Sequence, residues 1–148
     1  MIKESEIVIF EKQWRCELPS DFRNYILTDS YPNALTPKYW FDAFPYDMPG
    51  IIPFEREPEY ISNDWLILPC PITADMNLNN DWLKLFSKDT IDPFQGCISI
   101  AFHGCTFYDL LIVTGKDRGS IMSMDGDYGP PKFIAQNFKD YCKIDFKK

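Results

Sequence analysis

The N-terminal part of the chain carries apolar residues at the spacing of two amphipathic helices. Residues 3–13 place charged side chains between apolar ones, as a short helix does, although residues 7–10 would also fit a strand. Residues 18–27 predict a second helix, because Pro19 suits a first turn and the following apolar residues recur at i, i+3 and i+4. The apolar positions of the two faces are Ile7, Phe10 and Trp14, then Phe22, Tyr25 and Ile26.

The middle of the chain, residues 29–63, is rich in proline and aromatic residues. It holds six of the twelve prolines, which neither continue a helix nor donate to a sheet, so we expect loop with short extended pieces. Its many aromatic side chains are typical of an ordered loop rather than a flexible linker. After it, residues 65–68 predict a short strand, and Asn80 and Asp81 can begin a helix.

The C-terminal half of the chain has the pattern of strands. Three apolar runs of strand length are separated by short connections that contain glycine, which predicts an antiparallel meander. A loop over residues 125–131 follows, and Asn137 begins a closing helix. We therefore expect one α+β domain spanning residues 1–148, with a central, mainly antiparallel sheet flanked by N-terminal helices and a C-terminal helix. The predicted strands are residues 97–102, 108–113 and 120–124.

Charge is distributed unevenly along the chain. Of the 22 acidic and 15 basic residues, eight acids and one base lie between Tyr39 and Leu83, and we call these residues the acidic segment. The acidic segment accounts for the whole net charge of −7, because the rest of the chain is balanced. A negative field repels phosphate groups, so binding of nucleic acid or of an anionic membrane is disfavoured and a basic protein partner is favoured.

The cysteines and the N-terminal residues bear on the compartment of the protein. The five cysteines are scattered and include no CxxC pair, the spacing that a zinc site or a redox motif would need. The first six residues include two acids instead of the basic start of a signal peptide. No apolar run reaches the length of about 18 residues that spans a membrane. We expect a cytoplasmic protein with reduced thiols.

The residues that could carry catalysis or bind a metal do not form a recognisable motif. The single histidine, His103, lies two residues from Cys105, which leaves a thiol-dependent enzyme as a hypothesis, but the pair falls in a predicted turn without a third polar group. Asp125 and Asp127 resemble the start of a calcium loop, yet its sixth position is Pro130 instead of glycine. We therefore predict no catalytic residues, no metal and no cofactor.

The acidic segment is the candidate partner-binding region. Its aromatic side chains could supply buried contact area, and its acids could supply steering and specificity. A charged, solvated surface is the alternative, and the residues alone leave it open. The predicted partner-binding residues are Tyr39, Trp40, Asp42, Asp47, Glu55, Glu57, Glu59 and Asp64.

Several short stretches, in order along the chain, resemble the motifs of one protein family. Residues 18–27, with the sequence LPSDFRNYIL, are similar to the LPxxYRxFL signature that opens the SUKH superfamily, which is related to fungal Smi/Knr cell-wall regulators. The chain departs from the family pattern at Met122, where a tryptophan is usual. Further stretches that resemble the family's central strands and closing helix are residues 96–100, 110–115, 118–121 and 138–141.

This resemblance implies an α+β domain without catalytic residues. For bacterial members it implies an immunity protein that binds and neutralises a cognate secreted toxin, often a nuclease. A scaffold or regulatory module of the Smi/Knr type, which has no toxin partner, is the alternative that the resemblance leaves open.

Overall fold

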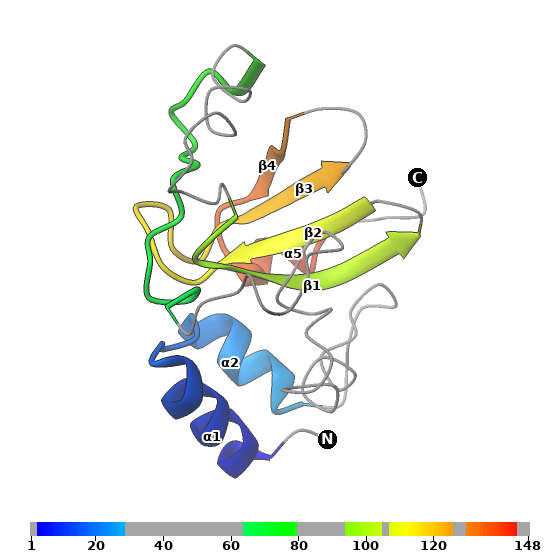
Figure 1. Cartoon of the computed structure of the whole chain (residues 1–148). Coiled ribbons are helices and arrows are strands. Elements are labelled where there is room, and N and C mark those ends of the chain that lie inside the picture. The colour runs from blue at the N-terminus through cyan, green and yellow to red at the C-terminus, as the bar shows by residue number, and fades with distance from the viewer. Residues whose placement is uncertain (1–2, 29–63, 80–93, 105–106, 126–129, 145–148) are drawn as a thin grey trace.

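The protein is an α+β domain built on a four-stranded antiparallel sheet (Figure 1). The structure, a computed structural model, describes residues 3–28, 64–79, 94–104, 107–125 and 130–144. The strands follow one another in the sheet in chain order, so the predicted fold class and the predicted meander are confirmed. The elements are α1 (Glu4–Trp14), α2 (Ser20–Ile26), β1 (Cys97–Gly104), β2 (Phe107–Ile112), β3 (Ile121–Asp125), β4 (Lys132–Ala135) and α5 (Phe138–Tyr141).

Helix α1 settles the choice between helix and strand at the N-terminus in favour of the helix. Its apolar stripe, Ile7, Phe10 and Trp14, is buried, as expected for side chains spaced three and four residues apart. At its start, the Glu6 carboxylate accepts a hydrogen bond from the Lys3 backbone N–H, 2.7 Å away. The helix ends at Arg15, whose left-handed backbone (φ 53°) turns the chain toward α2.

Charged side chains join α1 to α2. The Glu11 carboxylate accepts hydrogen bonds from the Leu18 N–H at 3.1 Å and from Arg23 Nε at 3.0 Å. Arg23 also pairs with Glu4. Its hydrogen bonds to Glu4 and then to Glu11 stabilise the charged guanidinium and raise the pKa of Arg23. The two helices are therefore fixed relative to each other at both ends of α1.

The sheet has one more strand than the sequence pattern predicts. β4 follows Pro130 and Pro131 and pairs with β3, with Phe133 opposite Met122. The prediction that a loop leads directly to the closing helix was therefore incomplete. The strand is only four residues long and its positions are exposed or half-buried, so it lacks the alternation of buried and exposed residues that a sequence pattern can reveal.

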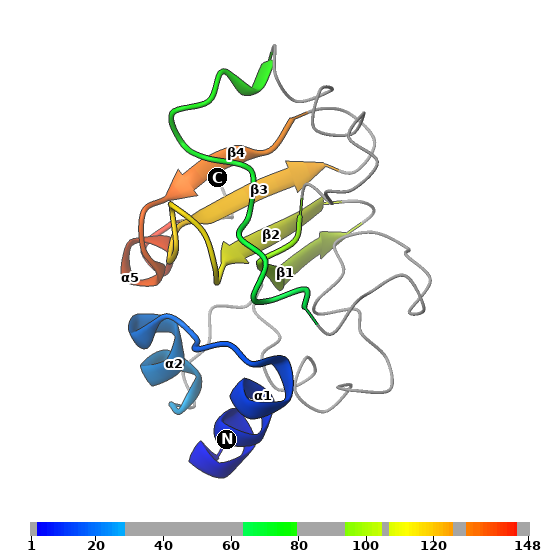
Figure 2. The same ribbon diagram turned by 60° about the vertical axis from the view of Figure 1, so that its left-hand side comes forward.

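Helix α5 closes the domain, as predicted, and packs against both α2 and the sheet. Asn137 caps it, since its Oδ1 accepts from the Asp140 N–H at 2.8 Å. The buried Tyr141 donates its hydroxyl proton to Oδ2 of Asp109 in β2 at 2.6 Å. Both views place α2 between α1 and α5 (Figures 1 and 2). The closing helix is thus connected to the centre of the sheet by a buried polar pair.

Residues 64–79 run across the sheet from the β1 side toward β4 (Figure 2, green). The prediction of a strand over residues 65–68 was wrong, because these residues form a turn in which the N–H groups of Ile67 and Leu68 donate to the Asp64 carbonyl. Trp65 and Leu66 are buried side by side while the next two residues are exposed, a pattern that a strand cannot produce.

Two other predicted segments lie outside the described residues: the proline-rich loop over residues 29–63 and the helix expected from Asn80 and Asp81. Among the residues that the structure does describe, no helix has the length and apolar character that crossing a membrane requires.

Candidate functional site

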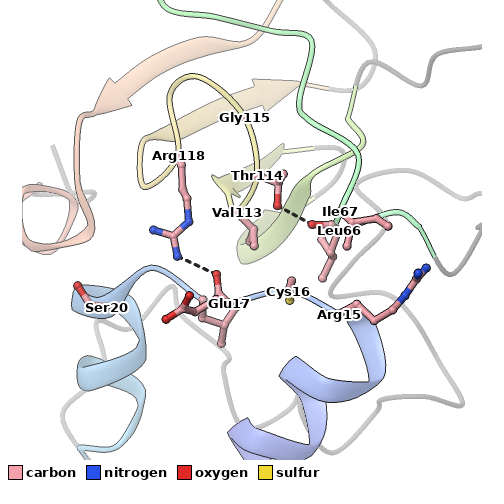
Figure 3. A pocket seen from close by; sticks show the side chains of 11 residues that line it. Arg15, Cys16, Glu17, Ser20, Leu66, Ile67, Val113, Thr114, Gly115 and Arg118 are labelled. Atoms are coloured by element: carbon pink, nitrogen blue, oxygen red, sulfur yellow. Dashed lines mark hydrogen bonds between the residues drawn. The ribbon is translucent and has the colours of Figure 1, made fainter.

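A cleft opens where the connection between α1 and α2 faces the sheet (Figure 3). Its volume is about 570 Å³. Three pieces of chain that are distant in the sequence form it: the helix connection, the turn after residue 64, and the loop between β2 and β3. The lining residues are Arg15, Cys16, Glu17, Leu18, Ser20, Leu66, Ile67, Val113, Thr114, Gly115 and Arg118.

The helix connection forms the first wall of the cleft. The left-handed backbone at Arg15 ends α1 and directs the next two residues along the cleft. The Cys16 N–H donates to the Glu11 carbonyl at 3.0 Å, which holds this turn in place. Cys16 is half-buried and Glu17 is exposed, so the wall presents a thiol and a carboxylate on either side of the turn.

The loop between β2 and β3 forms the opposite wall, and one arginine spans the gap. Arg118 Nη2 donates to the backbone carbonyl of Glu17 at 2.8 Å (Figure 3). Within the loop, the Arg118 N–H lies 3.3 Å from the Gly115 carbonyl. Gly115 has a φ of 141°, which side chains disfavour, so the glycine lets the loop fold back toward the helix connection.

The turn after residue 64 forms the third wall and packs tightly onto the strand ends. Thr114 Oγ1 donates to the Leu66 carbonyl at 2.5 Å. At Gly96 (φ 76°), a Cβ atom would lie 2.6 Å from the Thr114 carbonyl and 2.7 Å from the Leu68 carbonyl, so only glycine fits. Ile67, which lines the cleft, is exposed to 37%, and the next residue, Leu68, is exposed to 40%, which leaves apolar surface on this turn.

The electrostatics of the cleft disfavour nucleophilic chemistry at Cys16. Burial, and then the nearby Glu11, raise the pKa of Cys16 from its ordinary value of 9.0 to about 12, although Arg118 acts in the opposite direction. The thiol is therefore protonated at neutral pH, whereas a nucleophilic cysteine needs a thiolate. Arg15 forms a surface ion pair with Asp64 at the rim, and both side chains are about half exposed.

Metal binding finds no support in the described part of the chain. Within those residues, no three His, Cys, Asp or Glu side chains lie close enough together to hold an ion. His103 falls in β1 instead of the predicted turn, but its side chain and Cys105 lie outside the described residues, so the hypothesis of a thiol-dependent enzyme stays untested.

One predicted partner-binding residue lies in the part of the chain that the structure describes, and it is next to the cleft. Asp64 lies at its rim beside Arg15. Whether the acidic segment forms one continuous surface is a prediction that stays open. The members outside the described residues are Tyr39, Trp40, Asp42, Asp47, Glu55, Glu57 and Glu59.

Sequence reasoning missed the residues that define the cleft. Arg15 and Cys16 belong to no motif, Arg118 only begins one of the short stretches that resemble the family, and the two arginines are 103 positions apart in the sequence. One available signal was the pair of glycines at 115 and 119, which bracket the loop that carries Arg118 and both have positive φ. The contact between that loop and the helix connection depends on the tertiary fold, and the sequence pattern of a single loop carries no information about it.

The comparison with protein families agrees with this architecture. The SMI1/KNR4 family (SUKH-1) matches residues 1–143, which is nearly the whole chain. The match covers both N-terminal helices, the entire sheet and α5. No curated protein and no solved structure shows significant similarity to the chain. Because the match extends far beyond half of its length, the chain belongs to the SMI1/KNR4 family (SUKH-1).

Proposed function

We propose that this protein acts by binding another protein, without catalysis, as an immunity protein that neutralises a cognate secreted toxin in a bacterial cytoplasm. The observation that carries the proposal is the family match over residues 1–143. The protonated thiol of Cys16 in the cleft agrees with a binding role, since it lacks the reactivity of a nucleophile. The proposed toxin is a nuclease, because an enzyme that binds nucleic acid presents basic surface to its substrate.

The acidic segment supports a basic partner. It holds the entire net charge of the chain, so it would attract a positively charged groove or a neighbouring basic surface on the toxin. Opposite fields of this kind raise association rates to about 10⁸–10⁹ M⁻¹s⁻¹ at low salt. Tyr39 and Trp40 are the proposed aromatic anchors, and Asp64 is half exposed and pairs with Arg15, which lines the cleft.

Co-expression tests the function directly. The toxin encoded next to this protein should stop growth when expressed alone, and growth should return when this protein is expressed with it. The two proteins should also co-purify as a complex. Restored growth without a complex would contradict neutralisation by binding, and a complex without restored growth would favour the scaffold or regulatory alternative of the Smi/Knr type.

The steering step has a separate test in the association rate. Asp42→Asn with Glu55→Gln removes two charges from the acidic segment and should slow association several-fold at low salt, with a smaller effect at high salt. Glu6→Gln with Asp140→Asn removes two exposed charges elsewhere and is the matched control. Equal rates for the two double variants would remove the acidic segment from the proposal while leaving neutralisation itself intact.

A further inference from the structure

Two buried cysteines that are distant in the sequence lie in contact. The Sγ atoms of Cys70 and Cys97 are 3.4 Å apart, although 27 positions separate the residues in the chain. Cys97 is fully buried at the start of β1, and Cys70 is exposed to 4%. None of the four described cysteines is in a disulfide, and these two lie against each other. The sequence alone does not reveal this pair, because the five cysteines are scattered and form no CxxC motif.

Hydrogen bonds to the backbone around each cysteine fix the positions of the two residues. The Cys70 N–H donates to the Thr114 carbonyl at 2.8 Å, which fixes one partner to the end of β2. Trp65 Nε1 donates to the Cys97 carbonyl at 3.0 Å, and the Gly96 N–H donates to the Trp65 carbonyl at 2.6 Å. The two thiols are therefore in contact because the backbone around each of them is held in place by hydrogen bonds.

The thiol pair also lies next to the cleft. Gly115 lines the cleft, and a Cβ atom at that position would lie 3.4 Å from the Cβ of Cys70. Since glycine has no side chain, little separates Cys70 from the cleft, whereas Cys97 lies deeper. The burial of both sulfur atoms excludes a bulky reagent such as a peptide disulfide, so a small oxidant is required.

We propose that Cys70 and Cys97 are a modification site: a thiol pair that a hydroperoxide oxidises reversibly to an intramolecular disulfide. The Cys70 thiol gives up its proton as its sulfur attacks one peroxide oxygen, the O–O bond breaks, and the leaving hydroxide takes up that proton, so that hydrogen peroxide yields a sulfenic acid and one water. The sulfur of Cys97 then attacks the sulfenic sulfur, and the S–O bond breaks with release of a second water. Overall, two thiols and one hydrogen peroxide give one disulfide and two waters.

The disulfide would fasten the turn after residue 64 to β1. It would close a loop between residues 70 and 97, and such a cross-link stabilises a protein mainly by restricting its unfolded chain. We expect the midpoint temperature, Tm, to rise by about 5–15 °C on oxidation and to return on reduction. This inference goes beyond the proposed function and does not depend on it.

Mass spectrometry of the whole protein tests the proposal. The reduced chain is treated with hydrogen peroxide, remaining thiols are alkylated in denaturant, and the protein is digested without reductant. We expect a mass loss of two hydrogen atoms and a peptide that links Cys70 to Cys97. Oxidised protein in which both cysteines remain alkylatable, or whose cross-links join other cysteines, would overturn the proposal.

Single variants assign the two roles. In Cys97→Ala, the sulfenic acid should accumulate at Cys70, where dimedone added together with denaturant traps it. In Cys70→Ala, the deeper Cys97 should react far more slowly. Cys16→Ala is the matched control, because Cys16 lines the same cleft but should leave the cross-link unchanged. The cross-link is tested in the wild-type protein. A variant that misfolds would therefore not change the outcome of that test.

Discussion

Helix α2 and the connection that precedes it contact the rest of the domain in different ways. On one side, Phe22 and Tyr25 pack against Phe138 of α5, with both pairs of ring centroids 5.0 Å apart and edge-to-face. Asp21 reinforces this contact, since its Oδ2 accepts from the Phe138 N–H at 2.8 Å. We call this set of residues the α2–α5 junction.

On the other side, the connection before α2 faces the cleft. There, one exposed arginine bridges to a backbone carbonyl, and apolar side chains such as Ile67 remain partly in contact with solvent. The α2–α5 junction therefore contributes to stability through buried rings, whereas the connection before α2 borders a cleft with exposed apolar surface. Substitutions on the two sides should separate these roles.

The largest expected effect is at the centre of the α2–α5 junction. Phe138→Ala should lower the free energy of unfolding by about 3–5 kcal/mol, because Phe138 is 1% exposed and its loss leaves a cavity between three aromatic rings. Urea unfolding measures this change. The matched substitution on the cleft side is Ile67→Ala, which should cost less than about 1 kcal/mol. Similar costs for the two variants would show that the two sides do not differ.

The next effect concerns the polar pair that connects α5 to the sheet. Tyr141→Phe should cost about 1.5–3 kcal/mol, because Asp109 would lose the hydroxyl that donates to it in a fully buried position. Tyr25→Phe removes the same atom from a half-buried ring whose hydroxyl bonds to Cys142, and should cost less. If Tyr25→Phe is the more costly variant in urea unfolding, burial does not determine the strength of these contacts.

The sequence predicts the parts of the fold that have a strong local pattern. The buried stripe of α1, the three long strands and the Asn137 cap follow from periodicity and capping chemistry, and all are present in the structure. β4 has too few residues for a pattern. The turn at Trp65 and Leu66 looks like a strand in sequence because both are apolar, but the tight approach at Gly96 determines its conformation.

The candidate site was less predictable for a physical reason. The cleft and the Cys70–Cys97 contact both require segments that the fold alone brings together. Periodicity describes one element at a time, so it contains no information on which loop faces which turn. The uneven distribution of charge along the chain, in contrast, is visible in the sequence, and it motivates the acidic segment as a binding region.

Alkaline pH should remove stability at both Cys16 beside the cleft and Tyr141 in α5, and the loss at Cys16 should begin at the lower pH. Burial raises the pKa of the Tyr141 phenol far above 10.0 and that of Cys16 from 9.0 to about 12. Both groups are neutral when protonated, so the unfolded chain releases their protons first. Their contribution to stability is full below pH 9 and is lost as pH rises toward the pKa values of the folded state.

Urea unfolding between pH 8 and pH 11 measures this loss, with the pH range chosen around the ordinary values of 9.0 and 10.0. Cys16→Ala should make the decline shallower from about pH 9 upward, and Tyr141→Phe should do so only from about pH 10 upward. A decline that neither variant changes would mean that other groups cause it.

The smallest expected effect is the loss of the arginine that spans the cleft. Arg118→Met keeps the apolar stem but removes the donor to the Glu17 carbonyl, and should change the free energy of unfolding by less than about 1 kcal/mol because the bond is exposed. Lys116→Met, which removes an exposed ion pair with Asp75 from the same loop, is the matched control and should cost a similar amount. A cost above about 2 kcal/mol for Arg118→Met alone would place this bond among the contacts that hold the fold together. The cleft would then be a contact that stabilises the fold, as the α2–α5 junction is, and its residues could no longer be proposed as a binding surface for a partner.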